Sequence, residues 1–243
     1  MGRFRASVAG SVLVVVAVAA LVGPAGAADT QGTLAIVNGI PGKRVDVCLN
    51  GREIKSDLAY GRVVLRDIVP VGGKSLRSYA RDRRTCRGTI VAQKSFTLDP
   101  GADLTIVATK TFPRVVTFDN KVPTFLGEIP PSGAPATHAK IAWRHASDVP
   151  ADFKFRVWNP NAEQPVDPLD PAAIWTKGDA FTENANAELV VQVRATLPGD
   201  SETIASKRAF LPASHRVEWL LVGTDIGNIR FVLIDRTFSL ASP

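Results

Sequence analysis

Short stretches of alternating apolar and polar residues, separated by turn residues, make up most of this chain. In 45–49 the order is Val, Asp, Val, Cys, Leu, so the valines take one face of an extended segment and Cys48 takes the other. The Asn50-Gly51 pair that follows is a strong hairpin signal. Predicted strands lie at 33–37, 45–49, 63–68, 75–80, 89–97, 104–109 and 115–118, and at 140–144, 153–158, 188–194, 204–210, 218–222 and 230–234. Sustained helical periodicity is absent, and this spacing of short strands is typical of sheets packed face to face.

Two segments of the chain resemble each other. The segment 89–109 reads TIVAQKSFTLDPGADLTIVAT, and 203–224 reads TIASKRAFLPASHRVEWLLVGT. Their first eight positions keep Thr, Ile, a basic residue and Phe in register, and a second apolar strand follows in both. The copies begin 114 positions apart, at 89 and 203, which is the size of a domain and not of a solenoid repeat. The repeat therefore predicts two similar domains.

Together these patterns predict an all-β protein with two tandem immunoglobulin-like or transthyretin-like antiparallel β-sandwiches, at 30–121 and 139–239. A Pro-rich linker, 122–138, joins them, because its prolines and glycines resist both helix and sheet. Its Phe125 and Leu126 are too apolar for a free tether, so we expect them to dock on one domain.

The middle of the second domain is rich in Pro and Asp. We expect 159–173 to be an irregular insertion, with one helical turn near 171–175.

The first residues carry a targeting pattern. Arg3 and Arg5 precede an apolar run at 8–22, and small residues follow at 25–27. A membrane-spanning helix needs about 20 apolar residues, which is more than this run supplies. The pattern predicts a secretory signal peptide, 1–27, cleaved near Ala27, and an uncleaved anchor is the alternative. The mature protein is expected to be secreted, extracellular or associated with the cell envelope.

The formal net charge is +6, and it falls to about +4 when the two arginines of the signal peptide leave. This excess is too small to indicate nucleic-acid binding. The C-terminal apolar stretch, 230–234, is too short to span a membrane, so we expect no stable membrane insertion after signal cleavage. The expected partner is an envelope polymer or protein of unknown identity, and the sequence does not define an oligomeric state.

The chain has two cysteines, Cys48 and Cys86, both in the first predicted domain. Export places them where disulfides persist, so we predict that they pair. A bridge between positions 48 and 86 would stabilise the fold by roughly 3–4 kcal/mol through the entropy of the unfolded chain. Two free buried thiols are the alternative.

The segments 45–51 and 58–61 resemble a family of secreted bacterial β-sandwich domains of unknown function, whose opening strand reads like "vvhaspdapavDvyvdG". The stretch 144–153, RHASDVPADF, carries the same opening more literally. The first copy departs from the pattern with Asn38-Gly39 in place of His-Ala, and the second lacks the Asn-Gly turn. The resemblance implies two tandem copies, this fold and an exported location. It implies no catalytic residues and no cofactor.

The densest cluster of positive charge surrounds Cys86. A loop held by a disulfide and presenting guanidinium groups is suited to phosphate or carboxylate polymers. The candidate anion-binding residues are Lys74, Arg77, Arg81, Arg83, Arg84 and Arg87. A solvated loop that serves solubility is the competing interpretation, and it is the more common one.

A second cluster contains His145, Ser147, Asp148 and Asp152, which invites comparison with a hydrolase or a metal site. A nucleophilic serine needs a base and an oxyanion pocket, and the chain has no Gly-x-Ser-x-Gly motif. Three histidines in the whole chain also make a metal site improbable on composition. The favoured interpretation is that Ser147, Asp148 and Pro150 shape a turn and that Asp152 bonds backbone amides at the strand entry. Asp46 stands equivalently before its strand in the first copy, which favours this structural role.

All four tryptophans, Trp143, Trp158, Trp175 and Trp219, lie in the second predicted domain. Trp143 and Trp219 stand on apolar strands and are expected in the core. Trp158 lies opposite the apolar face of its strand, so it is a candidate carbohydrate platform, with core burial as the alternative.

The sequence thus predicts an exported, non-catalytic binding or structural module of the envelope, without metal or cofactor. The first alternative is a binder of anionic envelope polymers through the loop from Arg77 to Arg87. The second is a hydrolase around His145 and Asp148.

Overall fold

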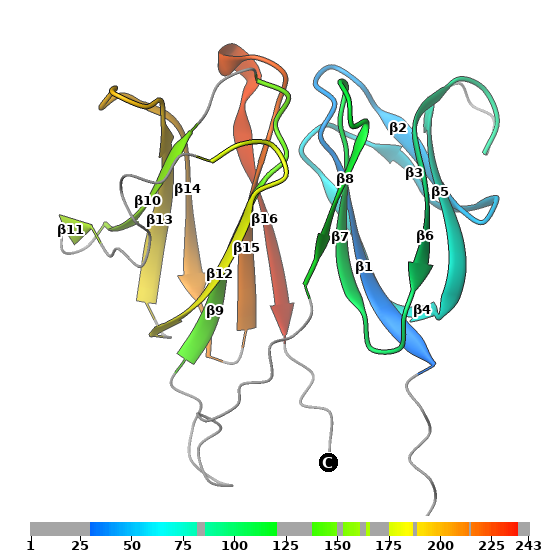
Figure 1. Ribbon diagram of the computed structural model, residues 1–243, viewed down its shortest axis with the longest axis horizontal. Helices are drawn as coiled ribbons and strands as arrows, with labels where there is room; N and C mark the ends of the chain where they lie inside the picture. Colours follow the sequence, from blue (N-terminus) through cyan, green and yellow to red (C-terminus); the bar gives the residue numbers. More distant parts are fainter. Residues whose placement is uncertain are drawn as a thin grey trace, which may run out of the picture.

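The computed structural model shows an all-β protein, which confirms the predicted fold class (Figure 1). It describes residues 30–81, 86–120, 138–149, 153–160, 164–165, 175–186, 189–213 and 215–237. The predicted signal peptide and linker residues 122–137 lie outside this part of the chain. One short 3-10 turn, η1 (Ile226–Asn228), accompanies the strands.

The first sandwich is built from two four-stranded sheets. Its inner sheet has the order β4-β1-β7-β8, and its outer sheet has the order β3-β2-β5-β6. The strands are β1 (Gln31–Asn38), β2 (Val45–Leu49), β3 (Arg52–Leu58), β4 (Val63–Pro70), β5 (Gly72–Ala80), β6 (Ile90–Leu98), β7 (Asp103–Ala108) and β8 (Val115–Asp119). Asn50 and Gly51 both take positive φ angles in the β2–β3 hairpin, as the Asn-Gly pair predicts.

The second sandwich has an inner sheet of order β12-β9-β15-β16 and an outer sheet of order β11-β10-β13-β14. Its strands are β9 (His138–His145), β10 (Lys154–Asn159), β11 (Gln164–Pro165), β12 (Ala180–Asn186), β13 (Leu189–Thr196), β14 (Thr203–Leu211), β15 (His215–Val222) and β16 (Arg230–Thr237). Both sheet orders repeat those of the first sandwich strand for strand. The two similar sequence segments form the corresponding strand pairs β6–β7 and β14–β15.

Three details differ from the sequence-based expectation. Strands β3 and β12 were not among the predicted strands, because neither has a run of apolar residues. The expected irregular insertion includes β11, which pairs with β10 through Trp158 and Asn159. Most of the expected helical turn near 171–175 lies outside the described residues, and its last residue, Trp175, forms a β-bridge with Phe153.

The sheets are not wholly antiparallel. In each inner sheet one central pair, β1 with β7 and β9 with β15, runs parallel. The chain reverses direction at each successive strand, and an even number of reversals separates the two members of each pair (Figure 1). The strands therefore run in the same direction, although all the other pairs are antiparallel.

Each sandwich buries its own apolar core between its two sheets. The first core includes Leu34, Ile36, Val45, Val47, Leu76, Leu98 and Ile106. The second core includes Trp143, Phe153, Phe155, Val157, Val193, Trp219 and Leu221. The rings of Trp143 and Trp219 stack with centroids 5.3 Å apart, which confirms the predicted core position of both.

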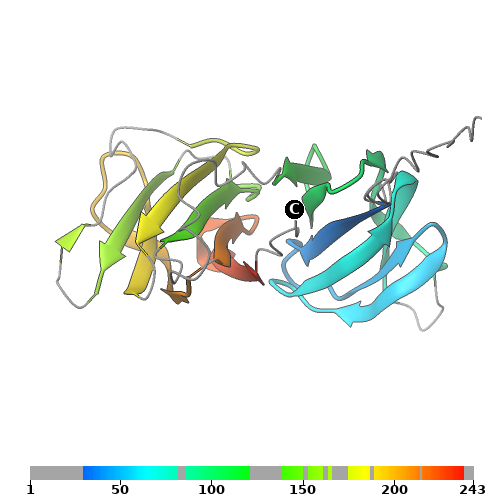
Figure 2. The same cartoon turned by 90° about the horizontal axis from the view of Figure 1, so that it is seen from below.

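A third apolar core joins the two inner sheets, which face each other across the middle of the molecule (Figures 1 and 2). Along β15, Trp219 and Leu221 point into the second sandwich, whereas Leu220 and Val222 point toward the first. Strands buried on both faces need apolar residues at consecutive positions, which explains the runs 106–108 in β7 and 219–222 in β15. The third core consists of Ala35, Val37, Val107, Val116, Phe118, Ala146, Leu220, Val222, Val232 and Ile234.

The same interface continues into a buried ion-pair network formed by Asp103, Arg216, Glu218 and Arg236. Arg216 and Arg236, of the second sandwich, both bind the carboxylate of Asp103 in the first. Glu218 Oε1 accepts from Arg216 Nε at 3.0 Å and lies 3.6 Å from Arg236 Nε. Its other oxygen accepts from Thr105 Oγ1 at 2.9 Å. Since Glu218 is fully buried, these bonds must replace its hydration.

The β3–β4 turn also contacts the second sandwich. The hydroxyl of Tyr60 donates to the backbone carbonyl of Asn228, and the guanidinium of Arg230 lies 4.3 Å from the centre of the Tyr60 ring. The Leu-Ala-Tyr-Gly segment that carried the family resemblance therefore lies at the contact between the two sandwiches.

Candidate functional site

The predicted disulfide between Cys48 and Cys86 is present. It links β2 of the outer sheet to the end of the β5–β6 loop, and it leaves no free cysteine. Cys48 lies on the face of β2 opposite the core valines, as the alternation predicts. The bridge is confined to the first sandwich.

The predicted anion-binding loop is only partly described. Arg83 and Arg84 lie outside the described residues. Arg81 donates to the carboxylate of Asp57 at 2.7 Å, and Arg44 binds the same carboxylate. Hydrogen bonding from Arg44, with the charges of both arginines, lowers the pKa of Asp57. The charge of Arg81 is thus already partnered.

The other described members of that cluster do not converge. Lys74 and Arg77 lie on opposite faces of β5, and Lys74 Nζ donates to the carbonyl of Val71 at 3.0 Å. Lys74 also lines a shallow hollow of about 510 Å³, whereas Arg77 pairs in register with Cys48 and Gln93. Arg87 is exposed beyond the disulfide.

The residues compared with a hydrolase are separated by the fold. His145 is buried in the second core against Phe153 and Phe155, and neither ring nitrogen has a hydrogen-bond partner. Burial lowers the pKa of His145 to about 4. The hydroxyl of Ser147 is likewise buried without a partner. The structure therefore contains no Ser-His or His-Asp pair at this position, and Asp152 lies outside the described residues.

Asp46 and Asp148 each accept hydrogen bonds from backbone amides, a role that the favoured interpretation gave to Asp152 and, by equivalence, to Asp46. Asp46 Oδ1 accepts from the amide of Asp57 at 2.8 Å. Asp148 Oδ2 accepts from the amides of Lys110 and Thr111, at 2.6 and 3.1 Å, and these belong to the other sandwich.

Trp158 is in β10, where it pairs in register with Gln192 and Pro165. Its side chain lies outside the described part of the structure. The proposed carbohydrate platform thus stays a prediction.

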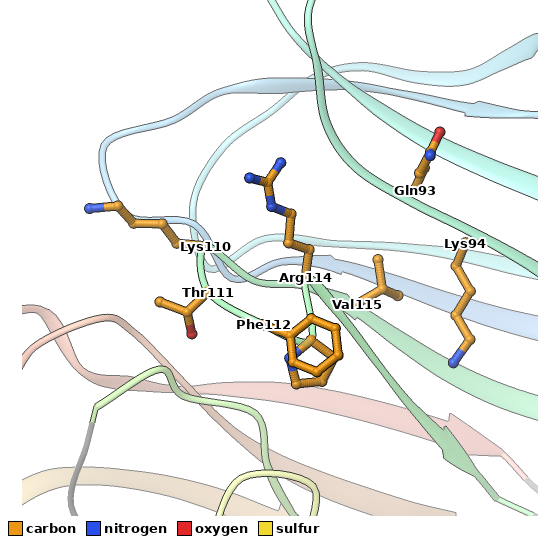
Figure 3. A pocket seen from close by; sticks show the side chains of 8 residues that line it. Gln93, Lys94, Lys110, Thr111, Phe112, Arg114 and Val115 are labelled. Carbon is orange, nitrogen blue, oxygen red and sulfur yellow. The ribbon is translucent and has the colours of Figure 1, made fainter.

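The structure forms a different candidate binding site in the first sandwich. It lies between β6, an edge strand of the outer sheet, and the β7–β8 loop. It is a cavity of about 620 Å³. Its lining residues are Gln93, Lys94, Lys110, Thr111, Phe112, Pro113, Arg114 and Val115 (Figure 3). We call it the loop site.

The chemistry of the loop site is cationic and aromatic. Phe112 is 94% exposed, more than any other exposed large apolar side chain among the described residues. Figure 3 shows its ring with Lys110 on one side and Lys94 on the other, and with the Arg114 side chain extending away above it. The lining of the loop site thus combines three cations with one exposed aromatic ring, which offers a ligand both charge and an apolar contact surface.

The second sandwich holds the β7–β8 loop. The carboxylate of Asp148 accepts hydrogen bonds from the hydroxyl of Thr111 and from the amides of Lys110 and Thr111. Lys177 Nζ donates to Thr109 Oγ1 at 3.2 Å and to the carbonyl of Pro113 at 3.1 Å, and it pairs with Asp148. Burial raises the pKa of Asp148, but hydrogen bonds from Lys177, Thr111 and the two amides together outweigh that effect, so the pKa lies below its usual value.

Sequence reasoning overlooked Lys94, Lys110, Phe112 and Arg114. The local signal was the order Lys-Thr-Phe-Pro-Arg at 110–114, which places an aromatic residue between two cations in a turn. The described residues contain no group of His, Cys, Asp or Glu that could hold a metal ion. They also contain no helix long and apolar enough to cross a membrane.

Comparison with known families decides the relationship that the opening strand suggested. Residues 32–153 match the model of a domain of unknown function, DUF4397. The chain belongs to the DUF4397 family. The matched region covers the described strands of the first sandwich and extends to β9 of the second. None of the curated proteins matches the chain.

Three solved structures resemble the chain at low identity. A family 26 carbohydrate-binding module from Eubacterium rectale, solved with maltoheptaose, is 9% identical, with 87% of this chain and 98% of that one covered and a TM-score of 0.28. The Bacillus anthracis TIE protein is 11% identical over 83% of this chain and 34% of its own, with a TM-score of 0.23. A candidate cell adhesion protein from Bacteroides fragilis is 12% identical over 75% and 71%, with a TM-score of 0.24.

Proposed function

We propose that this DUF4397 protein is an exported, non-catalytic module that binds anionic polymers of the cell envelope at the loop site. The observation that carries the proposal is a fully exposed Phe112 among Lys94, Lys110 and Arg114. An acidic polymer would place its charges on the cations and an apolar face on the ring. This replaces the loop from Arg77 to Arg87 as the favoured surface, since Arg81 is paired with Asp57.

The surroundings of His145, Ser147 and Asp148, the residues compared with a hydrolase, support a non-catalytic role. His145 has no hydrogen-bond partner and lies in an apolar core, where it could neither activate Ser147 nor reach a substrate. Asp148 is engaged by the β7–β8 loop. Full retention of any measured hydrolytic activity in His145→Ala would confirm that the activity arises elsewhere.

We also propose that the second sandwich is a second copy of the family domain. Equal strand orders and the segments 89–109 and 203–224 support this. Export rests on the signal pattern of 1–27. Mass spectrometry of the secreted protein is expected to give a chain that begins at Ala28 and loses about 2 Da when its bridge forms.

The binding proposal predicts the effect of charge removal. The variant Lys110→Gln/Arg114→Gln is expected to weaken binding to polyphosphate or polygalacturonate about two- to thirtyfold, because each exposed cation contributes about 0.2–1 kcal/mol. The dependence of affinity on salt should also become less steep. Phe112→Ala should weaken binding of polygalacturonate, whose sugar rings offer an apolar face, without changing that dependence, because the phenylalanine ring carries no charge. Titration at several salt concentrations measures both quantities.

The matched control is Arg83→Ala/Arg84→Ala, which removes two cations from the loop of the original prediction. It is expected to keep most of the affinity. If it abolishes retention while the Lys110 and Arg114 variant retains it, the polymer binds the disulfide-held loop and the loop site is not the binding surface.

A further inference from the structure

We infer that Asp148 and Lys177 of the second sandwich are positioning residues for the loop site of the first. The inference rests on the proposed function of that site. Neither side chain is among the residues that line the cavity, yet both bind the loop that displays Phe112.

Asp148 fixes the start of the loop. Its side chain is 1% exposed, and it accepts hydrogen bonds from two consecutive amides, those of Lys110 and Thr111. The Thr111 hydroxyl is a third donor. A carboxylate that accepts several hydrogen bonds from one short segment restricts the backbone torsions of that segment. Phe112 follows directly after it.

Lys177 fixes the two ends of the loop relative to each other. Its ammonium group binds Thr109 Oγ1 before Phe112 and the carbonyl of Pro113 after it. Thr109 Oγ1 also donates to the Pro113 carbonyl at 2.6 Å, which closes the loop at its base. Residues on both sides of Phe112 are thus held, while its ring is left exposed.

The two positioning residues are themselves built into the second sandwich. The Asp148 amide donates to the carbonyl of Gly223 at 2.6 Å, at the end of β15. Lys177 lies in a turn whose Gly178 amide donates to the carbonyl of His145 at 2.7 Å. Both residues are therefore fixed to the second sandwich, and the third apolar core holds that sandwich against the first. Ligand binding by one sandwich then depends on the other.

Charge gives a test in which positioning and simple electrostatics predict opposite results. Asp148→Asn adds one unit of positive charge near the loop site, so electrostatics alone predicts tighter binding of a polyanion. The asparagine oxygen accepts less strongly than a carboxylate and loses the attraction of Lys177, so positioning predicts weaker binding. We expect about tenfold weaker binding of polyphosphate.

The matched control is Asp99→Asn, the same change in charge on an exposed residue at the opposite end of β7. It is expected to bind polyphosphate as tightly as the unaltered protein or slightly more tightly. The double variant Asp148→Asn/Lys177→Gln keeps the net charge of the chain and is expected to bind about tenfold more weakly. Lys177→Arg, which keeps the cation and its donors, is expected to stay within about twofold. Thermal unfolding of each variant shows whether it is folded.

Each outcome bears on one of the two proposals. Wild-type affinity in the charge-neutral double variant would overturn the positioning role, while weakened binding by Phe112→Ala would leave the loop site itself in place. Wild-type affinity for polygalacturonate in Phe112→Ala and in Lys110→Gln/Arg114→Gln would overturn the proposed function instead. If Asp148→Asn unfolds, Thr111→Val tests the same contact without changing charge, and unchanged affinity there counts against positioning.

Discussion

Replacing Glu218 with glutamine is expected to lower the free energy of unfolding by about 3–5 kcal/mol, the cost of breaking a buried ion pair from one side. Glu218 is fully buried at the interface, where its carboxylate accepts hydrogen bonds from Arg216 and Thr105. Without that charge, Arg216 and Arg236 share the single carboxylate of Asp103. Two buried guanidinium groups would then repel each other with less compensation.

Urea unfolding at neutral pH measures this effect. Circular dichroism reports both sandwiches, whereas the four tryptophans, all in the second half of the chain, report that half alone. Glu202→Gln makes the same chemical change on an exposed residue and should cost less than about 0.5 kcal/mol. Equal losses in the two variants would mean that the buried network contributes nothing to stability.

Acidification from pH 6.5 to pH 4 is expected to remove about 3 kcal/mol of stability through His145 alone. Its pKa is about 4 in the folded protein, because burial among Phe153 and Phe155 disfavours the charged ring, and 6.5 is the value for an exposed histidine. Above pH 6.5 the ring is neutral in both states and has no effect. Between the two pKa values the unfolded chain binds a proton that the folded chain refuses, so stability falls as the pH falls.

His145→Leu should therefore flatten the pH dependence of the free energy of unfolding across that window. The experiment compares urea unfolding of the variant and the unaltered protein at pH 7.5, 6, 5 and 4.5. His215→Asn is the control, because His215 is partly exposed and pairs with Asp235. If His145→Leu keeps the same slope as the unaltered protein, the ring takes up a proton in the folded state and its burial does not govern the response to acid.

The loop site shows the limit of reading charge along a sequence. The cluster from Lys74 to Arg87 is dense in the chain, but β5 sends Lys74 and Arg77 to opposite faces and Asp57 pairs with Arg81. Lys94 and Lys110 are separated in sequence and line the same cavity because β6 and the β7–β8 loop both border it. Periodicity describes each strand separately and does not state which sheet edges adjoin.

The positions of the two aspartates could be predicted only in part. Turn chemistry assigned Asp148 to a turn and gave the bonding of backbone amides to Asp152, which lies outside the described residues, whereas in the structure Asp148 accepts from backbone amides. Those amides belong to Lys110 and Thr111, in the other sandwich. A carboxylate in a turn indicates that amides will be bound, but the partner depends on how the inner sheets meet.

The sequence by itself determined the β-sandwich class, the core faces of strands such as β2 and β10, and the pairing of Cys48 with Cys86. These follow from period-two alternation, turn residues and the count of cysteines, which are properties of neighbouring positions. Tertiary structure decided that β7 and β15 bury both faces, that the inner sheets share a core, and that the second sandwich holds the β7–β8 loop. Those features arise where two surfaces meet, because burial of the second face depends on a partner far away in the chain.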